Sequence, residues 1–278
     1  MIAASAPPWA HAELSALHLR ILSAAVLAPI ALGAAWFGAP FLPLLVLAAG
    51  VAMGWEWAML CGHERIDPQG YAVILGIFAS IALCGLGHPL GGSLLAFVGS
   101  GAAVWLARRR HDTETWLTAI GVLWVALPLG ALVWLSANEA YGRAVIFWIL
   151  GIVWATDTGA YVVGRQVGGP KLAPRFSPSK TWSGLLGGMV SAAIAGPVIV
   201  LLFGGSLNWP LVLASGALAG VAQCGDLAES VVKRHYGVKD ASSLIPGHGG
   251  LLDRLDGMLA VIPVVSILSL LFGSVTHW

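Results

Sequence analysis

The chain has 278 residues, of which 58% are hydrophobic and only 10% are charged, and its formal net charge is +1. Ordinary domains carry about 25% charged residues, so this composition excludes a soluble globular enzyme and gives no sign of a nucleic-acid partner. Apolar runs of roughly 17–25 residues recur along the chain, the length needed to cross the hydrocarbon core of a bilayer. We therefore predict an all-α, polytopic integral membrane protein.

Nine apolar segments are expected to span the membrane. In chain order they are about Ile21–Phe37 (broken at Pro29), Phe41–Leu60, Tyr71–Leu86, Leu90–Ala107, Trp116–Leu135, Ala144–Val163, Trp182–Phe203, Trp209–Val232 and Leu255–Phe272. Residues 1–20 lack a basic stretch ahead of an apolar core, so they are interpreted as a short interfacial tail and not as a signal peptide. Residues 21–278 then form a single transmembrane domain.

The positions of Lys and Arg predict the orientation. With nine spans the loops alternate between the two sides of the membrane, and all of the 14 Lys and Arg residues except Arg143 then fall on one side. Cytoplasmic loops carry the excess of these residues. The sequence therefore predicts a cytoplasmic N-terminus and places both long polar loops, Gly164–Thr181 and Lys233–Arg254, on the cytoplasmic face.

Two acidic residues lie within apolar segments. Glu56 lies between two tryptophans, which are common at membrane interfaces, so it is interpreted first as a head-group-layer residue and second as a helper facing the bundle interior. Asp157 lies near the cytoplasmic end of its segment, where an ionisable residue indicates a functional site. Gly159 and Ala160 beside it would allow a neighbouring helix to approach closely.

The loop after Asp157 is basic and rich in Gly, Pro and Ser. Its cations are Arg165, Lys171, Arg175 and Lys180. Such a loop can grip phosphate, because Lys and Arg donate charge-assisted hydrogen bonds to phosphate oxygens. A flexible loop that merely follows the topology rule explains the same residues equally well, so both interpretations stay open at this point.

The stretch Gln223–Gly257 is the most charged part of the chain. Four polar residues share one face of a predicted helix: Asp226, Glu229, Ser230 and Lys233. Asp253 and Asp256 share a face at the start of the next helix. Crowded carboxylates stay ionised only when a cation neutralises them, so the two helix ends predict a Mg²⁺ site completed by substrate phosphate. A loop held by Lys233–Asp240 and Arg254–Asp256 salt bridges is the alternative.

The same stretch carries a spaced pattern, S-x₂-K-R-x₄-K-D-x₇-H-G-G-x₂-D-R-x-D. It is filled by Ser230, Lys233, Arg234, Lys239, Asp240, His248, Gly249, Gly250, Asp253, Arg254 and Asp256. This pattern resembles the signature of the phosphatidate cytidylyltransferases, or CDP-diacylglycerol synthases. A second block, TDTGAYVVGR followed by KLAP and SPSKTW, resembles the region that precedes the signature in that family.

The resemblance implies transfer of CMP from CTP to phosphatidate, giving CDP-diacylglycerol and pyrophosphate for phospholipid biosynthesis. It implies Mg²⁺ as cofactor, with K⁺ as a second cation, and metal ligands drawn from Asp226, Asp253 and Asp256. The implied catalytic residues are Asp226, Lys233, Arg234, Lys239, Asp240, His248, Asp253, Arg254 and Asp256. The implied substrate-binding residues are Asp157, Arg165, Lys171, Ser177, Lys180, Ser230, Gly249 and Gly250.

The same resemblance implies a catalytic part at about residues 144–273, in a homodimer embedded in the cell inner membrane with its active site on the cytoplasmic face. Two other functions remain as alternatives. A CTP-dependent polyprenol or phytol kinase would transfer the γ-phosphoryl group and release CDP. A cation transporter would use Asp157, Asp226 and Glu229 as intramembrane ligands, but it predicts carboxylates near the bilayer midplane and inverted repeats.

Overall fold

The structure is a computed structural model that describes residues 8–61, 67–109, 115–138 and 141–273, and side chains from residue 18 onward except that of residue 115. Its described part contains nine helices long and apolar enough to cross a membrane. They are α1 (Pro8–Phe37), α2 (Phe41–Leu60), α3 (Pro68–Gly85), α4 (Pro89–Arg109), α5 (Thr115–Ser136), α6 (Gly142–Val167), α7 (Trp182–Leu202), α8 (Trp209–His235) and α9 (Leu252–Phe272). The predicted all-α, nine-span architecture is confirmed.

The connection between α6 and α7 is more ordered than a flexible loop. It contains two short antiparallel strands, β1 (Lys171–Ala173) and β2 (Ser177–Thr181), in which Lys171 pairs with Thr181. The side chain of Thr181 then caps α7 by accepting a hydrogen bond from the Gly184 amide over 3.1 Å. The loop interpretation of residues 164–181 is therefore wrong for the strand residues, and the hairpin gives its cations fixed positions.

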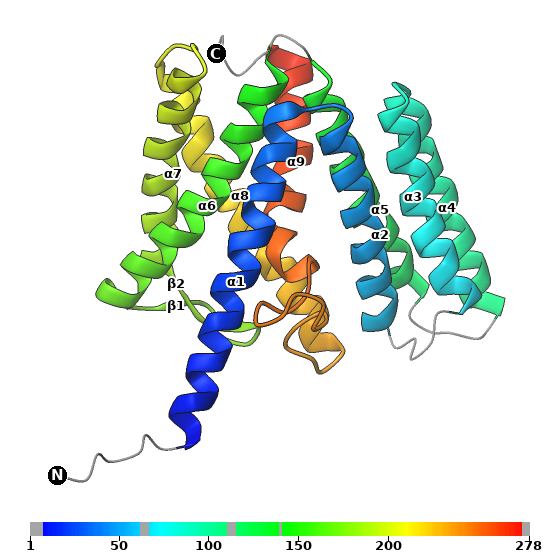
Figure 1. Ribbon diagram of the computed structural model, residues 1–278, viewed down its shortest axis with the longest axis horizontal. Coiled ribbons are helices and arrows are strands. Elements are labelled where there is room, and N and C mark those ends of the chain that lie inside the picture. The colour runs from blue at the N-terminus through cyan, green and yellow to red at the C-terminus, as the bar shows by residue number, and fades with distance from the viewer. Residues whose placement is uncertain (1–7, 62–66, 110–114, 139–140, 274–278) are drawn as a thin grey trace.

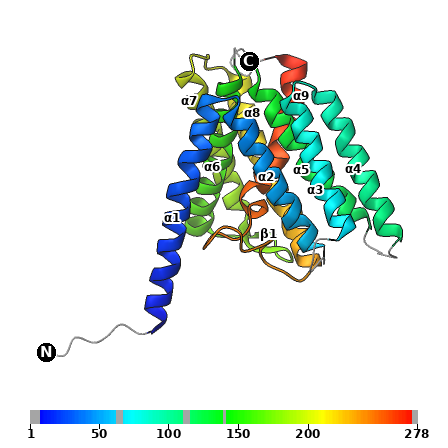
Figure 2. The same ribbon diagram turned by 45° about the vertical axis from the view of Figure 1, so that its right-hand side comes forward.

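The helices form two groups with α9 between them, and α1 contacts α2 of one group and α6 of the other (Figures 1 and 2). One group consists of α2, α3, α4 and α5, and the other of α6, α7 and α8, while α9 contacts α8 on one side and α5 and α2 on the other. Close approach of α6 and α7 depends on Gly159, where a Cβ atom would lie 2.8 Å from the Gly187 carbonyl oxygen. The prediction that small residues near Asp157 admit a neighbouring helix is confirmed.

The polar connections gather at one end of the bundle. The N-terminal end of α1, the hairpin and the α8–α9 loop all lie at the lower end in Figures 1 and 2. The end of α9 and the beginning of α6, where Arg143 lies, are at the opposite end, where the Arg143 guanidinium stands 4.9 Å from the Trp36 ring centroid. Successive connections therefore alternate between the two ends of the bundle, as the predicted orientation requires.

The first helix differs from its prediction. It begins at Pro8 and runs unbroken through Pro29 to Phe37, so residues 8–20 of the predicted interfacial tail are helical, and Pro29 does not divide the span. Proline is tolerated in membrane helices because neighbouring groups and local adjustments satisfy the freed carbonyl. The predicted bounds of α2 are reproduced, and α6 and α8 extend a few residues further toward the polar end.

Candidate active site

Two helices bring the acidic residues together. Asp226 and Glu229 lie on the last turns of α8, and Asp253 and Asp256 lie on the first turns of α9. The helices can cross closely because position 225 is glycine, where a Cβ atom would lie 2.7 Å from the Asp256 carbonyl oxygen. The predicted meeting of two carboxylate-bearing helix ends is confirmed.

A buried lysine connects these helix ends. The Lys233 ammonium lies 2.5 Å from Asp253 Oδ1 on α9 and 3.1 Å from Glu229 Oε1 on its own helix. Asp253 Oδ2 accepts hydrogen bonds from the amides of Ala241 (2.9 Å) and Gly250 (2.8 Å). Because Asp253 is bonded through both oxygens, its carboxylate anchors the α8–α9 loop.

These pairs correct the alternative salt-bridge scheme. Lys233 pairs with Glu229 and Asp253 instead of Asp240, whose residue is exposed. The Arg254 guanidinium donates to the His248 carbonyl oxygen over 2.5 and 2.9 Å. The charged stretch is thus a network across two helices and their loop, not a set of local loop bridges.

Glu56 belongs to this network, although it lies on α2. Its side chain is fully buried, and its Oε1 accepts from the Ser242 hydroxyl (2.5 Å) and the Leu251 amide (2.8 Å). Its Oε2 accepts from the Leu252 amide over 2.7 Å, so the carboxylate caps the start of α9, where unpaired amides attract negative charge. The head-group interpretation of Glu56 is wrong, and the bundle-interior interpretation is confirmed.

The two glycines of the motif make room for these carboxylates. Gly249 has a φ of +84°, which disfavours other residues, and a Cβ atom there would lie 3.1 Å from Asp253 Oδ2. A Cβ atom on Gly250 would lie 2.8 Å from Glu56 Oε1 and 3.0 Å from Asp253 Oδ2. Only glycine lets the loop backbone approach both acidic side chains this closely.

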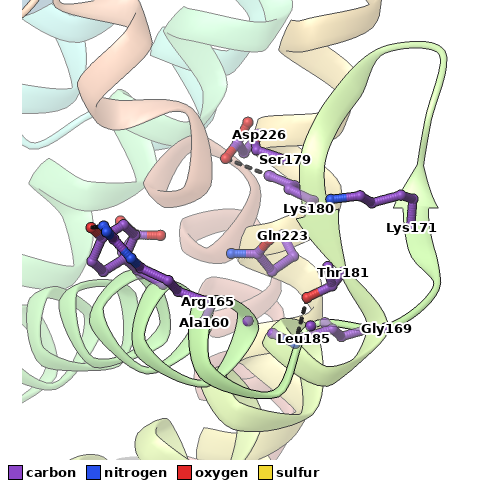
Figure 3. A pocket seen from close by; sticks show the side chains of 15 residues that line it. Ala160, Arg165, Gly169, Lys171, Ser179, Lys180, Thr181, Leu185, Gln223 and Asp226 are labelled. Carbon is purple, nitrogen blue, oxygen red and sulfur yellow. Dashed lines mark hydrogen bonds and ion pairs between the residues drawn. The ribbon is translucent and has the colours of Figure 1, made fainter.

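A polar cavity of about 500 Å³ opens between α6, α7, α8 and the hairpin (Figure 3). Its lining combines the predicted phosphate-gripping cations with two carboxylates and several glycines. The residues are Asp157, Ala160, Tyr161, Gly164, Arg165, Gly168, Gly169, Lys171, Ser179, Lys180, Thr181, Gly184, Leu185, Gln223 and Asp226. Cations from both the helix and the hairpin therefore face one volume.

The cavity contains an ion pair between the hairpin and α8. Lys180 Nζ lies 2.5 Å from Asp226 Oδ2, and Figure 3 shows the two side chains directed at each other. The Ser230 hydroxyl lies 3.4 Å from the other oxygen of Asp226. Arg165 approaches from α6 and donates to the Tyr161 hydroxyl over 2.6 Å, while Lys171 extends from β1.

Of the predicted site residues, only Asp157, Arg165, Lys171, Lys180 and Asp226 line this cavity. Four of the others lie apart from both the cavity and the network around Lys233 and Glu56. Arg234 is exposed and donates to the Val238 carbonyl oxygen over 2.9 Å, which holds the end of α8 to the following loop. Lys239 and Asp240 are exposed on that loop, and Ser177 begins β2. Their predicted contacts with substrate remain predictions.

His248 lies on the other side of the α8–α9 loop, against α1. Its Nδ1 is 2.7 Å from the Ser23 hydroxyl. Partial burial, and then the positive charges of Arg254 and Arg20, lower the pKa of His248 below its usual value of 6.5. This environment therefore favours the neutral imidazole more than water does.

The acidic helix ends can be compared with what a Mg²⁺ ion needs. Asp226 is partly exposed to the cavity, and Asp256 lies within electrostatic range of Asp226 and Asp157. Among the described residues no three His, Cys, Asp or Glu side chains converge as a ready-made cage. Mg²⁺ usually takes one or two carboxylates together with substrate phosphates, which this donor set can supply. Asp253 is the poorest candidate ligand, because Lys233 and two amides hold its oxygens.

Sequence comparison finds relatives of this protein that match almost the whole chain. A sequence model of the cytidylyltransferase family matches residues 18–272. The chain is 36% identical to the phosphatidate cytidylyltransferase of Brucella suis over 94% of its own length and 96% of the relative's. It is 36% identical to that of Pseudomonas aeruginosa over 91% and 96%, and 43% identical to that of Bacillus subtilis over 49% and 51%.

Proposed function

The chain belongs to the cytidylyltransferase family, and we propose that it transfers CMP from CTP to phosphatidate, giving CDP-diacylglycerol and pyrophosphate. The polar cavity is the observation that supports this reaction best. Its cations suit a polyphosphate, and it adjoins the acidic ends of α8 and α9, which would suit a metal ion that neutralises phosphate charge.

In this proposal the triphosphate of CTP lies in the polar cavity. Arg165, Lys171 and Lys180 donate hydrogen bonds to its oxygens, and Lys180 exchanges part of its pairing with Asp226 for the nucleotide. The glycines lining the cavity allow the phosphates to approach the backbone. Asp157 also lines the cavity, where it interacts electrostatically with Asp226 and Lys180.

The reaction joins a phosphate oxygen of the lipid to the α-phosphorus of CTP, and the bond from that phosphorus to the leaving pyrophosphate breaks. The attacking phosphate is already an oxyanion, so the chain need not supply a strong base. Asp226 and Asp256 would hold Mg²⁺, which neutralises phosphate charge when bound, and the K⁺ implied by the sequence pattern stays a further prediction. Positioning and electrostatic stabilisation then supply most of the rate enhancement.

Lys233 and Asp253 act as a positioning pair. Their 2.5 Å contact fixes α9 against α8, and the Asp253 oxygens hold the loop amides of Ala241 and Gly250. Arg254, one residue further, interacts electrostatically with Asp157 of the polar cavity. It is therefore placed to hold the phosphate of the lipid near the nucleotide.

The proposed setting is the cell inner membrane, with the polar end of the bundle in the cytoplasm. The support is the distribution of Lys and Arg together with the gathering of the polar loops at one end. CTP is then available to the cavity from the cytoplasm and phosphatidate from the bilayer. The homodimer implied by the sequence pattern stays a prediction, which a mass measurement in detergent would test.

The experiment uses purified protein with phosphatidate, Mg²⁺ and CTP labelled at the α-phosphorus or, in a parallel sample, at the γ-phosphorus. Cytidylyl transfer places the α-label in the lipid and the γ-label in pyrophosphate. A lipid kinase would instead place the γ-label in the lipid and release CDP. Absence of labelled lipid from both samples, with cation flux through liposomes containing the protein, would point to a transporter.

A further inference from the structure

A second cavity, of about 530 Å³, lies between α1 and the rest of the bundle and is almost entirely apolar. Side chains of α1, α2, α5, α6 and α9 form its walls. Alanines form much of two facing walls: Ala24, Ala28, Ala31 and Ala35 on α1, and Ala48, Ala49 and Ala52 on α2. Because these side chains are small, the helices leave a hollow instead of interdigitating.

The cavity opens toward the hydrocarbon. Leu27 and Ile30 line it and are also exposed, at 44% and 50% of their surface, so its outer boundary is the lipid-facing surface of α1. The span of α1 is itself only 11% buried, less than any other span among the described helices. A molecule in the bilayer can therefore reach this space from the side.

The polar end of the cavity carries positive charge. His248 and Arg254 are its polar lining residues, and Arg20 of α1 donates to the Gly247 carbonyl oxygen over 2.9 Å beside them. The two bonds from Arg254 to the His248 carbonyl use only part of its five N–H donors. An apolar chamber with a cationic end fits a molecule with an acyl chain and an anionic head group.

The apolar cavity also adjoins the polar one. Trp154 lines the first and Asp157 the second, and the two residues are one turn apart on α6. Asp157 interacts electrostatically with Arg254, which stands at the polar end of the apolar cavity. A phosphate held by Arg254 would therefore lie beside the cavity that we assign to the nucleotide.

We propose that this apolar cavity binds an acyl chain of the phosphatidate substrate, with α1 as its outer wall and Arg254 at the head group. This proposal rests on the proposed function for the identity of the lipid. The bonds from Arg20 and Ser23 to the α8–α9 loop hold the wall in register with the site. The volume lies within the range of about 300–1,000 Å³ that is usual for small-ligand sites.

The first test fills the cavity. Ala28→Trp places an indole in it, whereas Ala25→Trp adds the same group to the exposed face of the same helix and serves as the control. We expect Ala28→Trp to raise the KM for long-chain phosphatidate about tenfold, because the indole occupies volume that the acyl chain would fill. The KM for CTP and the turnover of dihexanoyl phosphatidate should stay close to those of the control. Equal kinetics of the two variants with long-chain phosphatidate would overturn the proposal.

A second test needs neither a variant nor turnover. Phosphatidate with a photoreactive group near the end of one chain is irradiated with the wild-type protein in detergent, without CTP. We expect labelled peptides from α1 and α2, and displacement of the label by unlabelled phosphatidate but not by phosphatidylcholine. Labelling confined to other helices, equal displacement by both lipids, or cross-links showing a second protein copy in the cavity would overturn it. Labelling without enzyme activity would instead refute only the proposed reaction.

Discussion

Glu56 offers the sharpest test of how the N-terminal half of the chain supports the site. Its carboxylate accepts hydrogen bonds from the Ser242 hydroxyl and from the amides of Leu251 and Leu252, at 2.5, 2.8 and 2.7 Å. The side chain is fully buried, so bulk water does not reach the carboxylate in the wild-type fold. Glu56→Ala therefore leaves two amides at the start of α9 without an acceptor.

The expected loss in free energy of unfolding follows from those two amides. Each buried donor left without a partner costs about 1–3 kcal/mol, which gives about 2–4 kcal/mol for Glu56→Ala, given that one of the two is only partly buried. Glu56→Gln keeps one oxygen, so one amide keeps its acceptor while the other faces an NH₂ group, and the cost falls to about 1–3 kcal/mol. If the loss of about 2–4 kcal/mol displaces α9 and raises the activation free energy by the same amount, kcat falls about 30- to 1,000-fold.

The assay measures formation of CDP-diacylglycerol together with the thermal unfolding midpoint in detergent. We expect kcat to decrease in the order wild type, Gln, Ala, while the KM for CTP changes little, because none of the three hydrogen-bond partners of Glu56 lines the polar cavity assigned to CTP. The control is Thr118→Val, which removes the 3.0 Å bond from Gln69 between α5 and α3, away from the site. A similar loss of kcat in the control, or activity of Glu56→Ala within threefold of wild type, would refute the positioning role.

Three further changes test other parts of the site. Gly250→Ala should abolish activity, since its methyl group would meet a carboxylate oxygen at 2.8 Å, whereas Gly220→Ala, with no atom within 4 Å, should leave CDP-lipid formation intact. Lys180→Met should raise the KM for CTP about tenfold or more by removing a charge-assisted phosphate contact, and Lys180→Arg should restore part of it; equal KM values would count against the CTP assignment. The pKa of His248 is lowered by folding, so its contribution to stability is present above the unfolded value of 6.5 and is lost as pH falls through the lower folded value. Thermal midpoints measured from pH 8 to pH 5 should fall more for wild type than for His248→Gln, and parallel curves would contradict this assignment.

The sequence predicts the spans well because each is a long apolar run with little charge, and length alone separates them from buried soluble helices. It also predicts the meeting of Asp226 with the start of α9, since the i, i+3 spacing fixes which face of each helix is acidic. The break at Pro29 was wrong because proline disfavours helices in water more than in a bundle within the membrane.

The parts that could not be predicted depend on contacts between distant segments. Glu56 bonds to Leu251 across 195 positions, and its only local signal is a carboxylate within an apolar segment. The hairpin at Lys171 is too short to show a strand pattern. The separation of Arg165 and Lys180 from Arg254 into two cavities depends on how α6 packs against α7 and α9, which no local spacing encodes.

The most direct measurement compares wild type with Asp226→Asn in the transfer of α-labelled CMP from CTP to phosphatidate, with Mg²⁺ present. Asp226 pairs with Lys180 in the polar cavity and faces the acidic start of α9, so the proposed nucleotide and metal sites both depend on it. Wild type should form CDP-diacylglycerol and pyrophosphate in equal amounts, while Asp226→Asn should be folded, with a wild-type elution profile, and inactive. Near-normal transfer by Asp226→Asn, or no labelled lipid from wild type, would contradict the account.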